Sequence, residues 1–118
     1  MTGFTMRIIV AATAASIALC TSTISWAGEA DTDVSEMIKC VVVSGGYTSQ
    51  KPNADDFLAV LNKIYAKDQS ARTFAQQNFQ RIGEETKNNV MNRGSKWLSS
   101  SWEGCKKSYP ALSAKYSK

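Results

Sequence analysis

The sequence predicts an all-α fold, a small orthogonal bundle of four to six short helices with one disulfide, and three observations predict it. Apolar residues recur at helical spacing through most of the chain after residue 27, whereas alternation with period two is absent. Both prolines and nearly all glycines stand between these apolar stripes, where helices begin and end. Two cysteines, Cys40 and Cys105, follow the N-terminal segment, an even number that fits one bridge.

The N-terminal 27 residues have the pattern of a cleaved signal peptide. Arg7 supplies a positive charge, and the uncharged run Ile8–Leu19 follows it. Ser25 and Ala27 are the small residues that a signal peptidase site has at positions −3 and −1. We therefore expect cleavage after Ala27 and export to the periplasm or the extracellular medium.

Two alternatives for this segment are weaker. As a helix, Ile8–Leu19 spans roughly 18 Å, short of the about 30 Å of a bilayer core, which argues against a membrane anchor. Cys20 raises the possibility of a lipoprotein, but Leu19 stands where a small residue is required before a lipidated cysteine. We expect a single helical domain over residues 28–118, without stable membrane insertion.

Export places Cys40 and Cys105 in an oxidising compartment, where a disulfide is expected between them. In the chain-entropy model a bridge across so long a loop contributes on the order of 4 kcal/mol. A domain of this size has a total stability of only about 5–9 kcal/mol, so the bridge would be a large part of it. Two free thiols, or an intermolecular bridge, are the alternatives.

The first helix is expected to begin at Asp33, with Glu36 at position N3 in a carboxylate version of the capping box. Gly45 and Gly46 are expected to end it. The β-branched run Val41–Val43 leaves a strand as the alternative. The apolar stripe of this helix consists of Val34, Met37, Ile38, Val41 and Val42.

The second helix follows a connection over Tyr47–Pro52. Asn53 is its predicted N-cap, and Asp55 and Asp56 lie in the first turn, where negative charge suits the helix dipole. Its apolar stripe consists of Phe57, Leu58, Leu61, Ile64 and Tyr65.

A third helix is expected to begin at Asp68 or Ser70. Gly83 should either kink it or separate it from the polar stretch Glu84–Arg93, and Gly94 is the predicted C-cap of that stretch. The apolar face of the third helix consists of Ala71, Phe74, Ala75, Phe79 and Ile82.

Ser95 is predicted to cap a helix with two of the three tryptophans of the chain. Burying two indoles removes more apolar area from water than any other segment could, so the other helices should assemble against this face. Pro110 fits the first turn of a short closing helix, with Leu112 and Tyr116 turned inward. The face of the tryptophan helix consists of Trp97, Leu98, Ser101, Trp102, Cys105 and Tyr109.

The composition argues against several kinds of catalysis. The chain has no histidine, which removes Ser–His and Cys–His nucleophilic machinery and the usual zinc sites. Paired cysteines leave no thiolate, and no Cys-x-x-Cys, glycine-rich phosphate loop or EF-hand spacing occurs. Glu84 and Glu85 point about 100° apart on a helix, so they do not flank one glycosidic bond. We expect no enzymatic activity, no metal and no cofactor. A small cell-wall hydrolase is the unfavoured alternative, and turnover on peptidoglycan tests it.

A protein partner is the predicted ligand class. Trp97 and Trp102 lie on opposite margins of their stripe, so one indole could be only partly covered next to Arg93, Lys96 or Lys106. A partly exposed tryptophan beside basic groups has the composition of an interface anchor. The alternative is that both indoles fill the core.

The net charge of +4 for the whole chain is too mild, and its signs too mixed, for nucleic-acid binding. The basic C-terminal half could meet an acidic partner or anionic lipid, or could simply be a solvated face. The sequence leaves the oligomeric state open, a homodimer included.

The C-terminal pattern C-x3-Y-x2-L-x3-Y, formed by Cys105, Tyr109, Leu112 and Tyr116, resembles the last helices of small exported immunity proteins that protect bacteria from type VI secreted amidases. The resemblance implies an all-α, periplasmic, disulfide-bonded protein with an early cysteine on its first helix, where Cys40 would stand. It covers roughly a dozen C-terminal residues and the two cysteines, and it carries over no inhibitory residue. Small size and a single bridge are also similar to the periplasmic acid-stress chaperones, whose cysteines are closer together.

These observations predict a non-enzymatic exported binding protein that acts by protein–protein contact. Its most concrete form is an immunity or inhibitor protein against a toxin or an envelope enzyme. A holdase-type envelope-stress chaperone is the second hypothesis. It predicts that low pH loosens the fold, which dye binding at about pH 2–3 tests.

Overall fold

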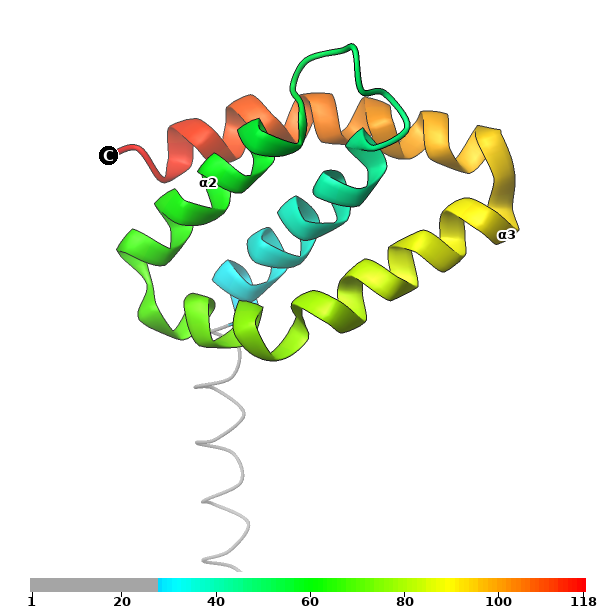
Figure 1. The fold of residues 1–118 in the computed structure, drawn as a ribbon. Coiled ribbons are helices and arrows are strands. Elements are labelled where there is room, and N and C mark those ends of the chain that lie inside the picture. The colour runs from blue at the N-terminus through cyan, green and yellow to red at the C-terminus, as the bar shows by residue number, and fades with distance from the viewer. Residues whose placement is uncertain (1–27) are drawn as a thin grey trace, which may run out of the picture.

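The computed structural model describes residues 28–118, and all regular secondary structure within this range is helical (Figure 1). The elements are a helix over residues 28–44, α2 (Ala54–Lys67) and α3 (Gln69–Lys115). The predicted signal peptide, residues 1–27, lies outside the described residues. Among the described helices, none combines the length and the apolar character needed to cross a bilayer.

The all-α class is confirmed, but the chain forms three helical elements in this range rather than four to six. The segments expected as separate helices run on as α3, because Gly83 keeps the helical conformation and Pro110 lies inside the helix without ending it. Only Gly94 breaks the backbone of α3, with φ +80° and ψ −170°. There the chain turns back on itself (Figure 1), and we call residues 69–93 the outer limb and residues 95–115 the inner limb.

The N-terminal helix differs from the prediction at its start. The chain is already helical at residue 28, so Asp33 is not an N-cap. Its carboxylate instead accepts hydrogen bonds from Tyr116 Oη (2.6 Å) and Lys115 Nζ (2.8 Å) at the far end of the chain. The predicted end is confirmed, since residues 45 and 46 form a turn, and the strand alternative for Val41–Val43 is wrong.

The caps of α2 and α3 are as predicted. Asn53 Oδ1 accepts from Asp56 N (3.0 Å), and Asp56 Oδ2 accepts from Asn53 N (2.8 Å), which completes a capping box. Asp68, rather than Ser70, caps α3. The predicted stripe of α2 is wrong at Leu58, which is exposed, and the buried side chains are those of Phe57, Val60, Leu61 and Ile64.

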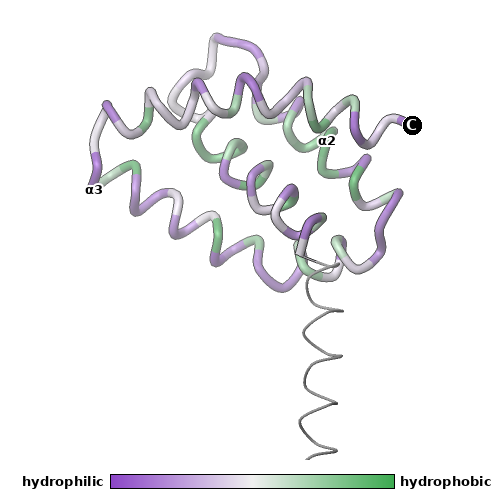
Figure 2. The backbone as a smooth tube through the Cα atoms, turned by 180° about the vertical axis from the view of Figure 1, so that it is seen from behind, coloured by the Kyte–Doolittle hydropathy of each residue, from purple (hydrophilic) through white to green (hydrophobic). Residues whose placement is uncertain are grey.

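The helix of residues 28–44 lies in the middle of the assembly, with α2 and the two limbs of α3 around it (Figures 1 and 2). The disulfide joins this central helix to the inner limb through Cys40 and Cys105, whose Cα atoms are 5.6 Å apart and 65 residues apart in sequence. All three elements contribute to one buried cluster. Its members are Ala30, Val34, Met37, Ile38, Cys40, Val43, Phe57, Val60, Leu61, Ile64, Ala71, Ala75, Ile82, Trp102, Cys105 and Leu112.

Candidate partner-binding surface

The reversal of α3 at Gly94 is the local structure that places the candidate residues. A φ of +80° lies in the left-handed region, which glycine enters without the penalty that a side chain brings. A Cβ built at Gly94 would meet no atom within 4 Å, so the position demands glycine for its backbone conformation and not for lack of space. We call the residues that flank it, Arg93, Lys96 and Trp97, the bend surface.

The bend surface brings together three of the five predicted partner-binding residues. Arg93 and Lys96 are exposed, and Trp97 is half-buried at the edge of the core. Neither Arg93 nor Lys96 forms an ion pair with any residue in the range 28–118. The surface therefore offers two unneutralised cations beside a partly accessible indole.

The structure places Trp102 in the core instead, so of the two tryptophans it is Trp97 that is partly covered. Its side chain is only 2% exposed. The indole stacks on Tyr47, with ring centroids 4.7 Å apart and planes 9° apart, and meets the ring of Phe57 edge-on at 6.5 Å. Within the described residues Trp102 Nε1 is buried without a hydrogen-bond partner. Turning Trp102 outward would break this stack.

Lys106 belongs with Trp102 and not with the bend surface. Its Nζ lies 5.9 Å from the centre of the Trp102 ring and 3.0 Å from a carboxylate oxygen of Glu103. A cation in this position covers the indole and is already paired. The five candidates therefore divide into an exposed group of three and a covered pair.

Sequence reasoning missed an apolar hollow next to the bend surface. It has a volume of about 570 Å³ and lies between the end of the central helix and the two limbs of α3. Its largest exposed side chain is that of Met91, 79% exposed. The signal in the sequence was Val90-Met91, the one apolar pair within the polar stretch Glu84–Arg93. The lining relevant here consists of Val42, Gly45, Gly46, Val90, Met91 and Leu98.

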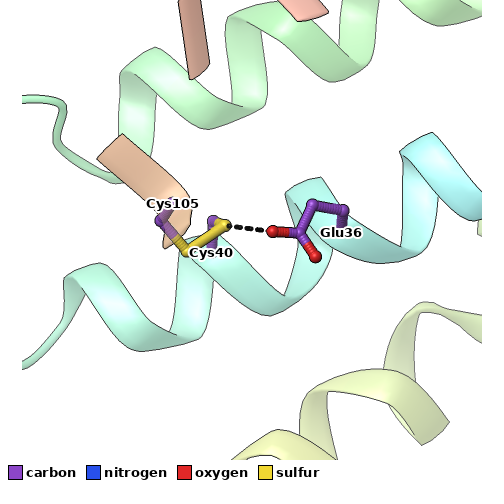
Figure 3. A group of neighbouring side chains, drawn as sticks. All are labelled: Glu36, Cys40 and Cys105. Carbon is purple, nitrogen blue, oxygen red and sulfur yellow. Dashed lines mark hydrogen bonds between the residues drawn. A yellow bond between two sulfur atoms is a disulfide. The ribbon is translucent and has the colours of Figure 1, made fainter. Parts of the chain in front are cut away.

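Glu36 lies beside the disulfide (Figure 3). Its Oε2 atom is 3.7 Å from Cys40 Sγ and accepts a hydrogen bond from Ser108 Oγ (3.2 Å), while its Oε1 atom pairs with Lys39 Nζ at 3.4 Å. One oxygen of Glu36 and the two sulfurs lie within 4.8 Å of one another, the spacing of a metal-ligand set. Because both sulfurs are in the disulfide, the set offers no thiolate and only one anionic ligand. The arrangement is therefore a disulfide with a neighbouring carboxylate and not a metal centre.

A second hollow, of about 510 Å³, lies where α2 meets the start of α3. Tyr65, Arg72 and Phe79 contribute to its walls. Burial raises the pKa of the Tyr65 hydroxyl, and the nearby Arg72 partly offsets this effect. Its neutral phenol and its cation are ordinary side chains of a polar groove, and the two groups do not form a nucleophile–base pair.

No family model matches the chain, and no curated protein or solved structure gives a significant match. The resemblance of the C-terminal pattern to immunity proteins therefore stays a prediction.

Proposed function

We propose that this protein is an exported, non-enzymatic binding protein that acts by protein–protein contact through the bend surface. The observation that carries the proposal is the combination of exposed Arg93 and Lys96 with half-buried Trp97, where neither cation has a carboxylate partner among residues 28–118. Tryptophan and arginine are the residue types most enriched at the energetic centres of interfaces. Unpaired cations beside them favour an acidic partner and speed the encounter with it.

In the proposed mechanism, the bend surface covers a cleft of the partner, and the rest of the domain holds that surface rigid. The inner limb carries Trp97, and the same limb is fixed to the central helix by the Cys40–Cys105 disulfide and to the connection after that helix by the stack of Trp102 on Tyr47. A preorganised surface loses little conformational freedom on binding, which favours tight association. Arg93 adds a guanidinium that can bind a carboxylate through two parallel hydrogen bonds.

Inhibition of a toxin or of an envelope enzyme is the most concrete form of this function. Its support is the pattern of Cys105, Tyr109, Leu112 and Tyr116, together with a disulfide that suits an oxidising compartment. The same reasoning places the protein in the periplasm or in the medium, consistent with the signal-peptide pattern of residues 1–27.

Charge reversal at the bend surface tests the proposal. The exported protein is purified with its disulfide intact, proteins that bind it are captured from an envelope extract, and the affinity of each is measured. We expect Arg93→Glu/Lys96→Glu to weaken the interaction roughly tenfold or more. The matched control is Lys67→Glu/Lys118→Glu, which reverses two exposed cations away from the bend. Equal losses in both variants, or none in either, would contradict the proposal.

An acid-activated holdase is the second candidate, and one observation favours it. Lys115 Nζ at the end of α3 forms ion pairs with the carboxylates of Glu29 (3.0 Å) and Asp33 (2.8 Å) on the central helix. We call these ion pairs the clasp, and they require ionised carboxylates. Loss of these ion pairs in acid would release the C-terminal turn of α3 from the central helix. Dye binding that rises steeply at about pH 2–3 supports the chaperone, and a flat response removes it.

A further inference from the structure

The apolar hollow beside the bend surface has no role in the proposal above. Residues 42–46, at the end of the central helix and in the turn after it, form one side, and residues of the outer limb and the start of the inner limb, far away in the sequence, form the other. Gly46 makes part of its floor, and a Cβ at this position would come within 3.1 Å of Leu98 Cδ2. The missing side chain lets the inner limb approach the turn closely, so backbone and methyl groups form the floor of the hollow.

The apolar side chains that line the hollow are more exposed to solvent than core residues are. Met91 is 79% exposed, whereas the other exposed large apolar side chains in the range 28–118, Leu58 and Phe79, are 38% and 39% exposed. Val42, Val90 and Leu98 around it are half-buried. Methionine is flexible and polarizable, and such side chains adapt to the apolar face of a bound helix.

The charges near the hollow indicate which sign of charge its partner should carry. Glu84 and Lys87 both line it, and they lie 3.8 Å apart, so they largely neutralise one another. Glu85 is held by Arg81 at 2.9 Å. Next along the chain come Arg93 and Lys96, which have no ion-pair partner in the range 28–118, so the surroundings are positive overall.

We propose that this hollow receives the apolar face of an acidic amphipathic helix of the partner protein, with the carboxylates of that helix meeting Arg93 and Lys96. This inference rests on the proposed function and specifies its partner. An apolar groove with a charged rim is the usual receptor for such a helix, which inserts side chains spaced i, i+3, i+4 and i+7. A volume of about 570 Å³ lies within the range of about 300–1,000 Å³ that is typical of ligand sites.

Two synthetic helical peptides provide the probes. Both carry leucine at i, i+3, i+4 and i+7, and their other positions are filled mainly with glutamate in one and with lysine in the other. Binding is followed by amide chemical shifts of the ¹⁵N-labelled, disulfide-bonded protein. We expect the acidic peptide to shift Gly45, Gly46 and residues 84–91, and the basic peptide to bind at least tenfold more weakly.

Variants of two exposed apolar residues locate the site. Met91→Asp should weaken binding of the acidic peptide tenfold or more, and Met91→Ala should weaken it less. Phe79→Asp is the matched control, because Phe79 is also exposed on the outer limb but lines the other hollow. Circular dichroism and thermal melting check that each variant folds.

Several outcomes would overturn the inference. These are equal binding of the two peptides, shifts confined to residues 62–79, and an equal effect of Met91→Asp and Phe79→Asp. Met91-dependent self-association, or Met91-dependent binding to anionic lipid vesicles without peptide binding, would assign the hollow to another occupant. If Arg93→Glu/Lys96→Glu abolishes partner capture while Met91→Asp leaves it intact, the proposed function stands and only this inference falls.

Discussion

The two limbs of α3 are similar in length and differ in what holds them. The outer limb buries two alanines, Ile82 and Thr86, whereas the inner limb buries Trp102, Cys105 and Leu112. Hydrophilic residues predominate along the outer limb (Figure 2). The inner limb is thus joined to the central helix by a covalent bond and to the following connection by an aromatic stack, whereas the outer limb is held by fewer large side chains.

The limbs also differ electrostatically where they approach the central helix. The inner limb ends in the clasp of Lys115 with Glu29 and Asp33. Next to the start of the outer limb, burial, and to a smaller extent the charge of the N-cap Asp68, raise the pKa of the Asp31 carboxyl. The inner limb therefore ends in a set of ion pairs, whereas the outer limb begins beside a carboxylate whose charged form is disfavoured. The comparison shows how the bend surface can be rigid on one side and adjustable on the other. Lys96 and Trp97 lie on the firmly held inner limb, whereas Arg93 lies on the more loosely held outer limb.

Removing the disulfide should have the largest effect on this asymmetry. We expect Cys40→Ser/Cys105→Ser to lower the free energy of unfolding by about 4 kcal/mol, because the bridge closes a loop of 65 residues in the unfolded chain. Urea denaturation measures the loss. A loss below about 1 kcal/mol would mean that packing of the inner limb, and not the bridge, holds it to the central helix.

Amide hydrogen exchange compares the limbs directly. We expect amides of residues 76–93 to exchange at least tenfold faster than those of residues 98–109, a difference of about 1.4 kcal/mol in opening free energy. The physical reason is that few large side chains are buried along the outer limb. Equal protection of both limbs would show that α3 opens as one unit.

The clasp at the end of the inner limb should have a smaller effect. Tyr116→Phe removes the 2.6 Å hydrogen bond to Asp33 and should lower the free energy of unfolding by about 1 kcal/mol. Burial, and then the bond to Asp33, raise the pKa of Tyr116 to about 12 from an ordinary value of 10.0. A raised pKa means that this stabilisation is complete below pH 10.0 and is lost as the pH rises through about 12. Denaturation across this window should therefore show wild type approaching the variant, and a constant gap would contradict the assignment.

Local signals in the sequence predicted much of the fold. The Asn53 cap and the glycine turn after residue 44 follow from rules that depend on a few neighbouring residues, and the pairing of Cys40 with Cys105 follows from the cysteine count. Gly94 was predicted as a helix end, and its positive φ shows why glycine stands there. Gly83 carries the same local signal and stays helical, because the flanking helix and its buried Ile82 override it.

The candidate surface was predicted less well, because burial depends on the partners of a side chain. Trp97 and Trp102 lie on opposite margins of one helical stripe, and the contacts of Trp102 with Tyr47, Phe57 and Lys106 distinguish them. Tyr47 lies in a connection whose path no periodicity predicts. The hollow at Met91 likewise depends on the close approach of Leu98 to Gly46, two residues that are 52 positions apart in the sequence.

Removing the charge of the half-buried Asp31, next to the start of the outer limb, should have the smallest effect, and it should stabilise. Burial, and then the facing charge of Asp68, raise the pKa of Asp31 above its ordinary value of 3.8, and one of its oxygens is buried without a partner within the described residues. Because the ionised carboxylate is less favourable in the folded chain than in the unfolded chain, the free energy of unfolding falls as the pH rises through this raised pKa. Asp31→Asn should therefore raise the free energy of unfolding at pH 7 by roughly 0.5 kcal/mol, with the gain vanishing below pH 3.8.

The control for this prediction is Asp55→Asn, which removes a carboxylate that suits the dipole at the start of α2. Its expected effect at pH 7 has the opposite sign, a loss of a few tenths of a kcal/mol. Urea denaturation of both variants at pH 7 and at pH 3 distinguishes repulsion at Asp31 from a general effect of removing negative charge. If both variants gain stability at pH 7, the net charge of the chain is responsible, and the two limbs do not differ electrostatically at their contacts with the central helix. If only Asp31→Asn gains, the cost is local to Asp31, where burial and the charge of Asp68 disfavour the ionised carboxylate.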